Sequence, residues 1–454
     1  MRYYFVEPPE IGDNWELSSV YPPIINMLDG IVTINNTRVY MEIILRLNCS
    51  ALNAQHHSKI VIVGGGAGGC SVAAKCVKAL GKNSVTIIDP ANKHYYQPMF
   101  TLAGGGLTKL SQSYKYMSDV LPKSAKWAQD SAAEFDPKNS TVTTTSGDTF
   151  KYDVLLIAVG IHLLYEDIPG LVNALDNYSN VGSIYSPKYV EKTYRAIQKF
   201  EKGNLIYTYP NSFIKCAGAP LKICFIHEEF LQKCGKRSHA NVTYSTTLPV
   251  IYSVKVYADA LWKVIKSRNI NVNIRTSLVE IHPEKNEAIF QNLDKPSQKF
   301  TVEYSLLHVV PPTRTPLPLK TNKDLVDDDG FLTVNKFTMQ HTRYPNIFGI
   351  GDCTNVPTSK TLAAVSAQSK VVYNHIRAVL NGKQLCLTYN GYTSCPLVTG
   401  IGKCILAEFG YNFRLLETFP IRQDKESYNT TNRCYKNCFT GYVDSGYVYN
   451  NLRT

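Results

Sequence analysis

Two cysteines far apart in the sequence, Cys216 and Cys395, have the residue type and flanking sequences expected of a redox site. Cys216 lies in the segment KCAGAP, which we expect to form the turn before a helix over residues 221–234. Backbone N–H groups at that helix end, together with Lys215, would favour the thiolate of Cys216. The alternative is that both cysteines are ordinary buried thiols, because cysteine is among the most buried residue types. The choice depends on whether the chain binds a redox cofactor.

A glycine-rich turn after residue 63 predicts a dinucleotide-binding site. A β-branched run, typical of a buried strand, leads into the sequence GGGAGG and then into an alanine-rich segment that we expect to be helical. In this pattern Gly64 permits the tight turn and Gly66 lets the backbone approach a pyrophosphate, with Ala67 next to it in the same turn. Gly69 allows the helix to pack closely, and the helix N-terminus faces the phosphates.

Asp89 completes this pattern. It ends a second expected strand, residues 85–89, about 20 residues beyond the glycines, where a carboxylate can bind a ribose hydroxyl. A G-x-G-x-x-G sequence by itself also occurs in glycine-rich turns of unrelated α/β proteins. Because both strands, the helix and Asp89 occur in the required order, we predict dinucleotide binding.

Two later segments resemble the flavoprotein reductases that contain two dinucleotide-binding domains, and they favour FAD as the cofactor. Residues 152–160 resemble the strand and glycine turn, here Gly160, at the exit from the FAD domain. Residues 344–352 resemble the late strand after which Asp352 would hold the ribityl chain. The helix that follows would direct its positive end at the flavin ring, with Lys360 at that end. The alternative for Lys360 is a solvated lysine at a helix start.

A reductase of this class that uses NAD(P)H needs a second glycine fingerprint at the start of its second domain. There the chain has an expected strand over residues 204–210 and then reaches Cys216 without a G-x-G-x-x-G sequence. We therefore expect that the electron donor is not a nicotinamide.

Six short motifs resemble the eukaryotic mitochondrial type of sulfide:quinone oxidoreductase, and the similar region runs from about residue 59 to residue 426. The motifs are HYYQP at 94–98, IKCAGAP at 214–220, NLDKP at 292–296, HVVPP at 308–312, GDCTN at 351–355 and NGYTSCPLVTG at 390–400.

This resemblance implies a flavoenzyme that oxidises hydrogen sulfide. Sulfide would attack a disulfide between Cys216 and Cys395, leaving a persulfide on Cys395 and a thiolate on Cys216 that engages the flavin. Electrons would pass to ubiquinone, and the persulfide sulfur to glutathione, another small thiol, or sulfite. The chemistry is consistent, because a disulfide is electrophilic, hydrosulfide is a small soft nucleophile, and a flavin accepts two electrons without a metal.

Two other functions stay open at this point. One is a type II NADH:quinone reductase of the same fold, which the missing second fingerprint disfavours. The other is a relative that keeps the scaffold but lacks flavin or cannot reduce quinone.

The expected fold class is α/β, with two doubly wound Rossmann-like domains and a C-terminal segment that returns over the flavin. The expected parts are an N-terminal extension over 1–57, an FAD domain over 58–165 and 320–385, a second domain over 166–319, and a segment over 386–454 that carries Cys395.

Composition favours a soluble or peripheral enzyme. The chain has 454 residues, 44% of them hydrophobic, and no apolar run approaches the length of a spanning helix. No nucleic-acid motif accompanies the net charge of +12, so we expect no nucleic-acid partner, but rather attraction to an acidic membrane surface and to hydrosulfide.

The remaining cysteines suggest no further chemistry. No Cys-x-x-Cys sequence occurs among the 12 cysteines, and we expect no metal site. We expect Cys70 and Cys76 to be small core residues of the first helix, and Cys224, Cys234 and Cys353 to be bystander thiols near the flavin.

Both ends of the sequence depart from the family pattern. The first 57 residues contain several acidic residues, unlike a mitochondrial presequence, so Met41 is considered as an alternative start. A location on the matrix face of the inner mitochondrial membrane is thus implied by the resemblance alone. After Glu426 the sequence is polar where the family has apolar membrane-binding helices, and we expect an altered, truncated tail with weakened membrane attachment and quinone access.

Overall fold

The computed structural model describes residues 54–418 and 427–428. Nearly all of the predicted N-terminal extension, the alternative start at Met41 and the tail beyond residue 428 lie outside the described residues. Within the described ranges, no helix is both long enough and apolar enough to cross a membrane.

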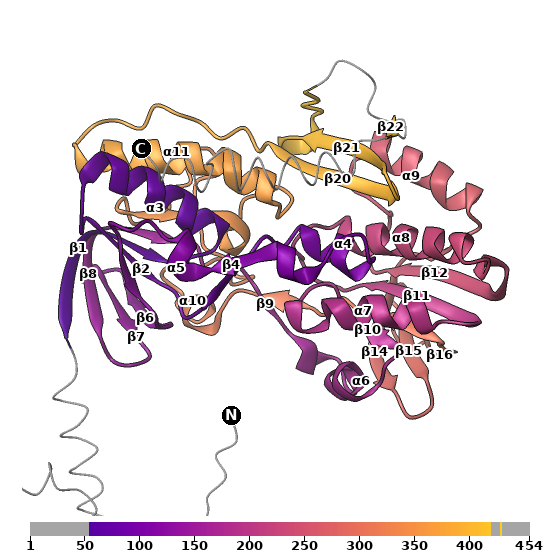
Figure 1. Cartoon of the computed structure of the whole chain (residues 1–454). Helices are drawn as coiled ribbons and strands as arrows, with labels where there is room; N and C mark the ends of the chain where they lie inside the picture. Colours follow the sequence, from indigo (N-terminus) through magenta and orange to yellow (C-terminus); the bar gives the residue numbers. More distant parts are fainter. Residues whose placement is uncertain (1–53, 419–426, 429–454) are drawn as a thin grey trace, which may run out of the picture. The chain divides into compact units, whose positions relative to one another are not determined.

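A seven-stranded sheet forms the centre of the first half of the fold (Figure 1). Its strands are β1 (Gln55–Val63), β2 (Val85–Ile88), β5 (Lys126–Ala128), β6 (Ala132–Asp136), β7 (Thr141–Thr144), β8 (Thr149–Ile157) and β19 (Ile347–Gly349). Strand β1 pairs in parallel with β2 and β8, and β8 pairs in parallel with β19, which comes much later in the chain. Residues 60–63 of β1 are all buried, as expected for a central strand covered on both faces.

Two helices lie side by side over this sheet, α3 (Ala67–Leu80) and α11 (Leu362–Leu380) (Figure 1). Helix α11 begins at Thr361, whose Oγ1 accepts the Ala364 N–H at 3.1 Å and so satisfies one of the free donors at the helix start. The helix continues to Leu380, well past the apolar stretch visible in the sequence. Its polar Gln368 is buried and accepts the Gly351 N–H at 2.9 Å.

Shorter elements complete this half of the fold. They are β3 (Lys93–Tyr95), α4 (Met99–Gly104), β4 (Tyr114–Tyr116), α5 (Met117–Val120) and α10 (Leu317–Lys320). The exception is α4, which packs against two helices of the other half, α7 (Pro187–Lys199) and α8 (Ala219–Lys233).

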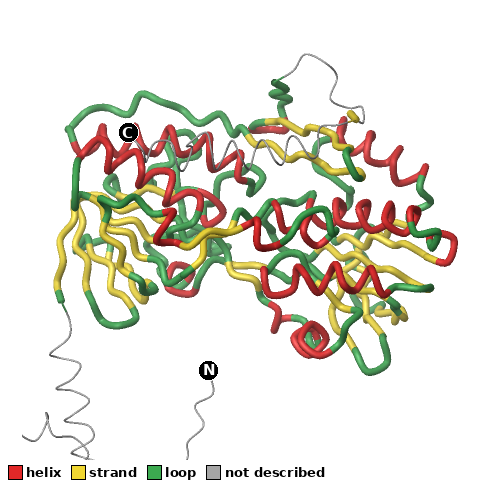
Figure 2. The backbone as a smooth tube through the Cα atoms, in the orientation of Figure 1, coloured by secondary structure: helices red, strands yellow, loops and turns green. Residues whose placement is uncertain are grey.

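A second sheet forms the centre of the other half of the fold (Figure 2). It has five strands and is parallel throughout. Its strands, in sheet order, are β10 (Val181–Gly182), β17 (Leu306–His308), β11 (Gly203–Tyr209), β12 (Ala240–Thr246) and β13 (Asn271–Asn273). The helices of this half are α6 (Leu171–Asn177), α7 (Pro187–Lys199), α8 (Ala219–Lys233) and α9 (Lys255–Ser267). An antiparallel sheet of β14 (Thr276–His282), β15 (Glu287–Asn292) and β16 (Lys299–Glu303) follows.

The chain leaves the first half through β9 (His162–Leu163) and returns through β18 (Thr313–Arg314), and these two short strands pair antiparallel. The α/β fold class with two Rossmann-like halves is therefore confirmed. The domain boundaries at 165 and 319 stay predictions.

A β-hairpin follows α11 and lies against α8 and the start of α11 (Figure 1). It consists of β20 (Thr393–Gly400) and β21 (Lys403–Phe409), and β22 (Ser427–Tyr428) pairs with β21. The hairpin brings Cys395 back to the junction of the two halves.

The close packing of α3 on the glycine turn makes Gly69 a sensitive position. A Cβ atom added at Gly69 would lie 1.9 Å from the Gly64 carbonyl oxygen, so the helix would have to move. We expect Gly69→Ala to lower the free energy of unfolding by about 1–3 kcal/mol, measured by urea unfolding and far-UV circular dichroism. The control Ala79→Lys, on the exposed side of the same helix, should change it by less than about 0.5 kcal/mol. An equal effect of the two substitutions would contradict the assigned contact.

Candidate active site

The structure brings Cys216 and Cys395 together. Cys216 lies in the turn before α8 and Cys395 lies on β20, and their sulfur atoms are 3.4 Å apart. Cys216 is half-buried and Cys395 is buried. Because a disulfide requires a separation of about 2.05 Å, a modest movement of the side chains would suffice to form one.

The backbone of Cys216 is held in a conformation that is uncommon for a residue other than glycine. Its φ angle is +52°, in the left-handed region. Its N–H donates to the Lys360 carbonyl at 2.8 Å, and its own carbonyl accepts the Ala219 N–H at 2.8 Å and the Tyr185 hydroxyl at 3.3 Å. These three hydrogen bonds hold the turn, and such strained residues are concentrated at functional sites.

The two thiols have opposite electrostatic preferences. A hydrogen bond from Cys395 lowers the pKa of Cys216, and the ammonium of Lys222 lowers it further against the opposing effect of burial. The same hydrogen bond, together with burial, raises the pKa of Cys395. In the reduced pair the negative charge therefore resides on Cys216, and Cys395 keeps the proton.

The lysine that contacts the thiol is Lys222, a residue that we did not identify from the sequence. It belongs to α8, is 4% exposed and hydrogen-bonds to Cys216. The predicted residue, Lys215, instead donates to Gln97 Oε1 and to the Tyr185 carbonyl at 2.9 Å. Burial lowers the pKa of Lys215 to about 8, and the nearby charges of Asp352 and Cys216 oppose this shift. The sequence signal that could have identified Lys222 is its position, one turn into the helix that follows Cys216.

A single cavity of about 660 Å³ runs from the glycine turn to the two cysteines. The predicted cofactor residues that line it are Gly64, Gly66, Ala67, Asp89, Gly160, Asp352 and Lys360, together with Cys216 and Cys395. Gly69 does not line the cavity, and its contact with the Gly64 carbonyl serves the packing of α3.

The glycine-turn end of the cavity fits a dinucleotide. Gly64 has a φ angle of +102°, and a Cβ atom there would lie 2.4 Å from the Ala158 carbonyl oxygen. By contrast, a Cβ atom added at Gly66 or at Gly160 would meet no atom within 4 Å, so both glycines border open space. Asp89 accepts the Gly65 N–H at 2.6 Å, and its carboxylate oxygens retain lone pairs for a ribose hydroxyl.

The other end of the cavity is formed by the N-terminus of α11 and the residues before it. Lys360 donates to the carbonyl groups of Asp352 at 2.7 Å and Thr354 at 3.1 Å, and its ammonium lies 4.3 Å from the centre of the Phe331 ring. Lys360 is thus turned inward and is not a solvated lysine. Burial raises the pKa of the Asp352 carboxyl, opposed by the charges of Lys360 and Lys215.

Four of the five other cysteines considered near the site are buried and are poor nucleophiles. Burial raises the pKa of Cys76 to about 12 and of Cys353 to about 11, and it also raises the pKa of Cys70 and Cys224. Cys234 is exposed at the end of α8. The part of the chain described here contains no group of three or more His, Cys, Asp or Glu side chains that could hold a metal ion.

Known proteins share this architecture and much of this sequence. The pattern of the family described as pyridine nucleotide-disulphide oxidoreductase matches residues 58–205. The structure of sulfide:quinone oxidoreductase from Aquifex aeolicus has a TM-score of 0.71 and 20% sequence identity, and the match covers 86% of this chain and 91% of that one. At this identity the likeness concerns the fold alone.

Two curated relatives are much more similar in sequence. The mouse protein named mitochondrial sulfide:quinone oxidoreductase is 45% identical over 373 residues, which are 82% of each chain. The protein of the same name from Dictyostelium discoideum is 40% identical over 374 residues, again 82% of each chain. This level of identity over most of both chains shows that the present chain belongs to the sulfide:quinone oxidoreductase family of flavoprotein enzymes.

Proposed function

We propose that this protein oxidises hydrogen sulfide with FAD as its flavin, through a redox-active disulfide between Cys216 and Cys395. The observation that supports this most directly is the 3.4 Å separation of the two sulfur atoms at one end of the cofactor-sized cavity. The proposed electron acceptor is ubiquinone, and the proposed sulfur acceptor is glutathione, another small thiol or sulfite.

The opposite preferences of the two cysteines favour one direction of attack. Hydrosulfide attacks the Cys395 sulfur, the S–S bond breaks, and Cys216 leaves as the thiolate, because a thiol of low pKa is the better leaving group. Cys395 then carries the persulfide. Lys222 stabilises the charge that appears on Cys216.

The acceptor completes the cycle at Cys395. A thiolate or sulfite takes the outer sulfur of the persulfide, which leaves Cys395 and Cys216 both reduced. The two thiols then form the disulfide again and lose two electrons. These two electrons correspond to the two-electron oxidation of one sulfide, so the cycle is balanced. When bound, FAD supplies a two-electron acceptor that a quinone can reoxidise. The N-termini of α3 and α11 both face the cavity and favour negative charge there.

In this chain a cysteine occupies the turn where an NAD(P)H-dependent reductase of this class would have its second glycine fingerprint. The turn between β11 and α8 carries Cys216, and Cys216 bonds to Lys360 across the site. This arrangement argues against the NADH:quinone reductase alternative.

A spectroscopic titration distinguishes the proposed function from both alternatives. The flavin absorbance band should bleach with sulfide and not with NADH. A purified protein without flavin would support the scaffold alternative.

We also propose a mitochondrial location on the matrix face of the inner membrane, as the names of the relatives suggest a mitochondrial enzyme. The quinone is dissolved in the membrane, so the enzyme has to bind at its surface. The net charge of +12 supports attraction to an anionic surface.

Replacing either cysteine should stop the reaction without removing the cofactor. We expect Cys216→Ser and Cys395→Ser to lower sulfide-dependent quinone reduction by about 10³-fold or more, because neither can form the disulfide. Flavin content should stay at the wild-type level. Cys234→Ser, at the exposed cysteine, is the matched control and should retain full activity. Substantial turnover in either active-site variant would refute the proposed chemistry.

Gly66 tests the placement of the cofactor. A valine there meets no protein atom at its Cβ position and projects into the cavity, so the fold should survive while the pyrophosphate is excluded. We expect Gly66→Val to purify with only traces of flavin, as measured by absorbance after denaturation. Cys76→Ser, on the same helix but away from the cavity, should stay yellow. If both variants hold equal flavin, the phosphate site lies elsewhere.

The role of Lys222 predicts a change in pH dependence. Its positive charge lowers the pKa of Cys216, so Lys222→Met should raise that pKa, by about 1–3 units for a close partner. The thiolate of the reduced enzyme would then form only at higher pH. The rate of iodoacetamide alkylation at Cys216, followed by mass spectrometry across the pH range, measures this shift. Lys233→Met, at an exposed lysine of the same helix, should leave the profile unchanged, and an unchanged profile for Lys222→Met would rule out the assigned contact.

A further inference from the structure

Helix α8 and the β20–β21 hairpin carry the two redox cysteines and run alongside each other. At the cysteine end, a Cβ atom added at Gly218 would lie 2.6 Å from Leu397 Cδ2 and 3.2 Å from the Cys395 sulfur. Farther along, Ile226 of the helix and Val398 of the strand share a small buried cluster. These contacts are apolar and therefore non-directional, so by themselves they do not fix the position of the strand along the helix.

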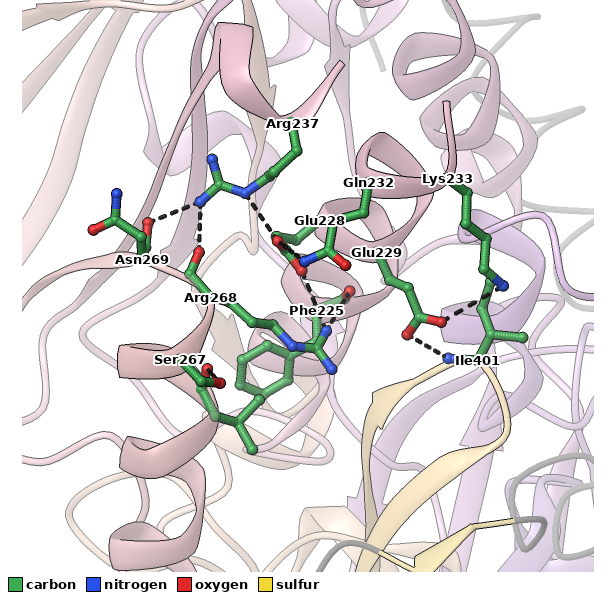
Figure 3. Close-up of polar contacts among 11 residues, drawn as sticks. Phe225, Glu228, Glu229, Gln232, Lys233, Arg237, Ser267, Arg268, Asn269 and Ile401 are labelled. Carbon is green, nitrogen blue, oxygen red and sulfur yellow. Dashed lines mark hydrogen bonds and ion pairs between the residues drawn. The ribbon is translucent and has the colours of Figure 1, made fainter. Parts of the chain in front are cut away.

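A directional contact lies at the far end of the pair. The Ile401 N–H, in the turn of the hairpin, donates to Glu229 Oε2 at 2.9 Å (Figure 3). The Glu229 side chain is only 14% exposed, and the ammonium of Lys233 lies 3.5 Å from its other oxygen. A hydrogen bond to an ionised carboxylate is among the stronger types and requires a defined geometry.

Gly400 shows how closely the hairpin approaches this carboxylate. A Cβ atom added there would lie 2.0 Å from Glu229 Oε2, so with a larger residue either the carboxylate or the turn would have to move, and the hydrogen bond would lose its geometry. The contact therefore depends on both partners, the glutamate on α8 and the glycine in the hairpin.

The helix is itself anchored by the neighbouring glutamate. Glu228 is fully buried, and it accepts hydrogen bonds from Arg237 Nε at 2.8 Å and Arg268 Nη1 at 3.3 Å (Figure 3). Arg237 also donates to the carbonyl groups of Arg268 and Asn269, beyond the end of α9. Glu228 thus attaches α8 to its own domain, and Glu229 attaches the hairpin to α8.

We propose that Glu229 is a positioning residue for the redox pair: by accepting the Ile401 N–H it fixes the hairpin along α8 and holds Cys395 beside Cys216, where a small movement of the side chains forms the disulfide. This inference rests on the proposed function, because it assumes that the two cysteines form the redox-active disulfide. Loss of the contact would let Cys395 move away from Cys216 and would lower the effective concentration of one thiol at the other.

The test is the thiol–disulfide equilibrium of the holoenzyme. The protein is equilibrated anaerobically with mixtures of reduced and oxidised glutathione, and the free thiols at Cys216 and Cys395 are alkylated and quantified by mass spectrometry. Two glutathione thiols reduce the one disulfide and give oxidised glutathione and two protein thiols. The flavin absorbance of the same samples shows whether reduction stops at the cysteines.

We expect Glu229→Ala to shift this equilibrium toward the dithiol by about tenfold, which corresponds to about 30 mV. Gly400→Ala should shift it in the same direction from the hairpin side, and should have little further effect in the Glu229→Ala background, where the clashing carboxylate is absent. Glu229→Gln keeps an acceptor oxygen and should stay within about twofold of wild type. Gln232→Ala removes a hydrogen bond to Glu228 on the same helix and should leave the equilibrium unchanged.

Two outcomes would overturn the inference in distinguishable ways. A wild-type protein with no disulfide between Cys216 and Cys395 would refute the proposed function and the positioning role together. A wild-type disulfide whose equilibrium is unaltered in folded Glu229→Ala or Gly400→Ala would refute the positioning role alone. Far-UV circular dichroism and flavin content establish that each variant is folded before the comparison.

Discussion

The hydrogen bond from the Cys216 N–H to the Lys360 carbonyl joins the two halves of the candidate active site. Lys360 directly precedes Thr361, the residue that caps α11, and Cys216 directly precedes the turn into α8. One backbone contact thereby fixes the distance between a reactive sulfur and a helix N-terminus that come from different halves of the fold. The left-handed conformation of Cys216 persists because this bond and those to Ala219 and Tyr185 oppose its relaxation.

The charges near the cysteines explain how a buried thiolate can be tolerated. Lys222 hydrogen-bonds to Cys216, while Lys215 and Lys360 line the same cavity and are opposed there by Asp352. An isolated buried anion would be costly, and it would take up a proton. With three ammonium groups nearby, the site instead favours anions, which include both the thiolate and a hydrosulfide that enters.

The sequence was informative where the chemistry depends on residues close together in the chain. The segment from Gly64 to Asp89 contains a strand, a turn, a helix and a second strand, so its pattern predicts the geometry that the structure has. The resemblance of residues 344–352 to a late strand also predicted β19, although its pairing with β8 was not predicted. The residues that were missed depend on tertiary packing. Glu229 lies on α8, and nothing in its local sequence indicates that its side of the helix meets the hairpin. For Lys222, on the same helix, the position one turn after Cys216 was a usable signal. Adjacency in the chain favoured Lys215 over Lys222, although a residue next to a cysteine does not necessarily point at its sulfur.

The late position of β19 has a consequence for biosynthesis. Strand β8 ends at Ile157, and β7 pairs with one edge of its first residues, 149–151. Strand β19 pairs with the same edge at residues 155–157, but it begins only at Ile347, after the whole second domain has been made. For the time needed to add that domain, the nascent chain therefore exposes an unpaired edge at residues 155–157 of β8, all three of which are apolar. Uncovered edges are sites of wrong pairing between chains, and contacts between distant residues form slowly. We therefore expect the nascent chain to depend on molecular chaperones more strongly than a protein whose first sheet closes early.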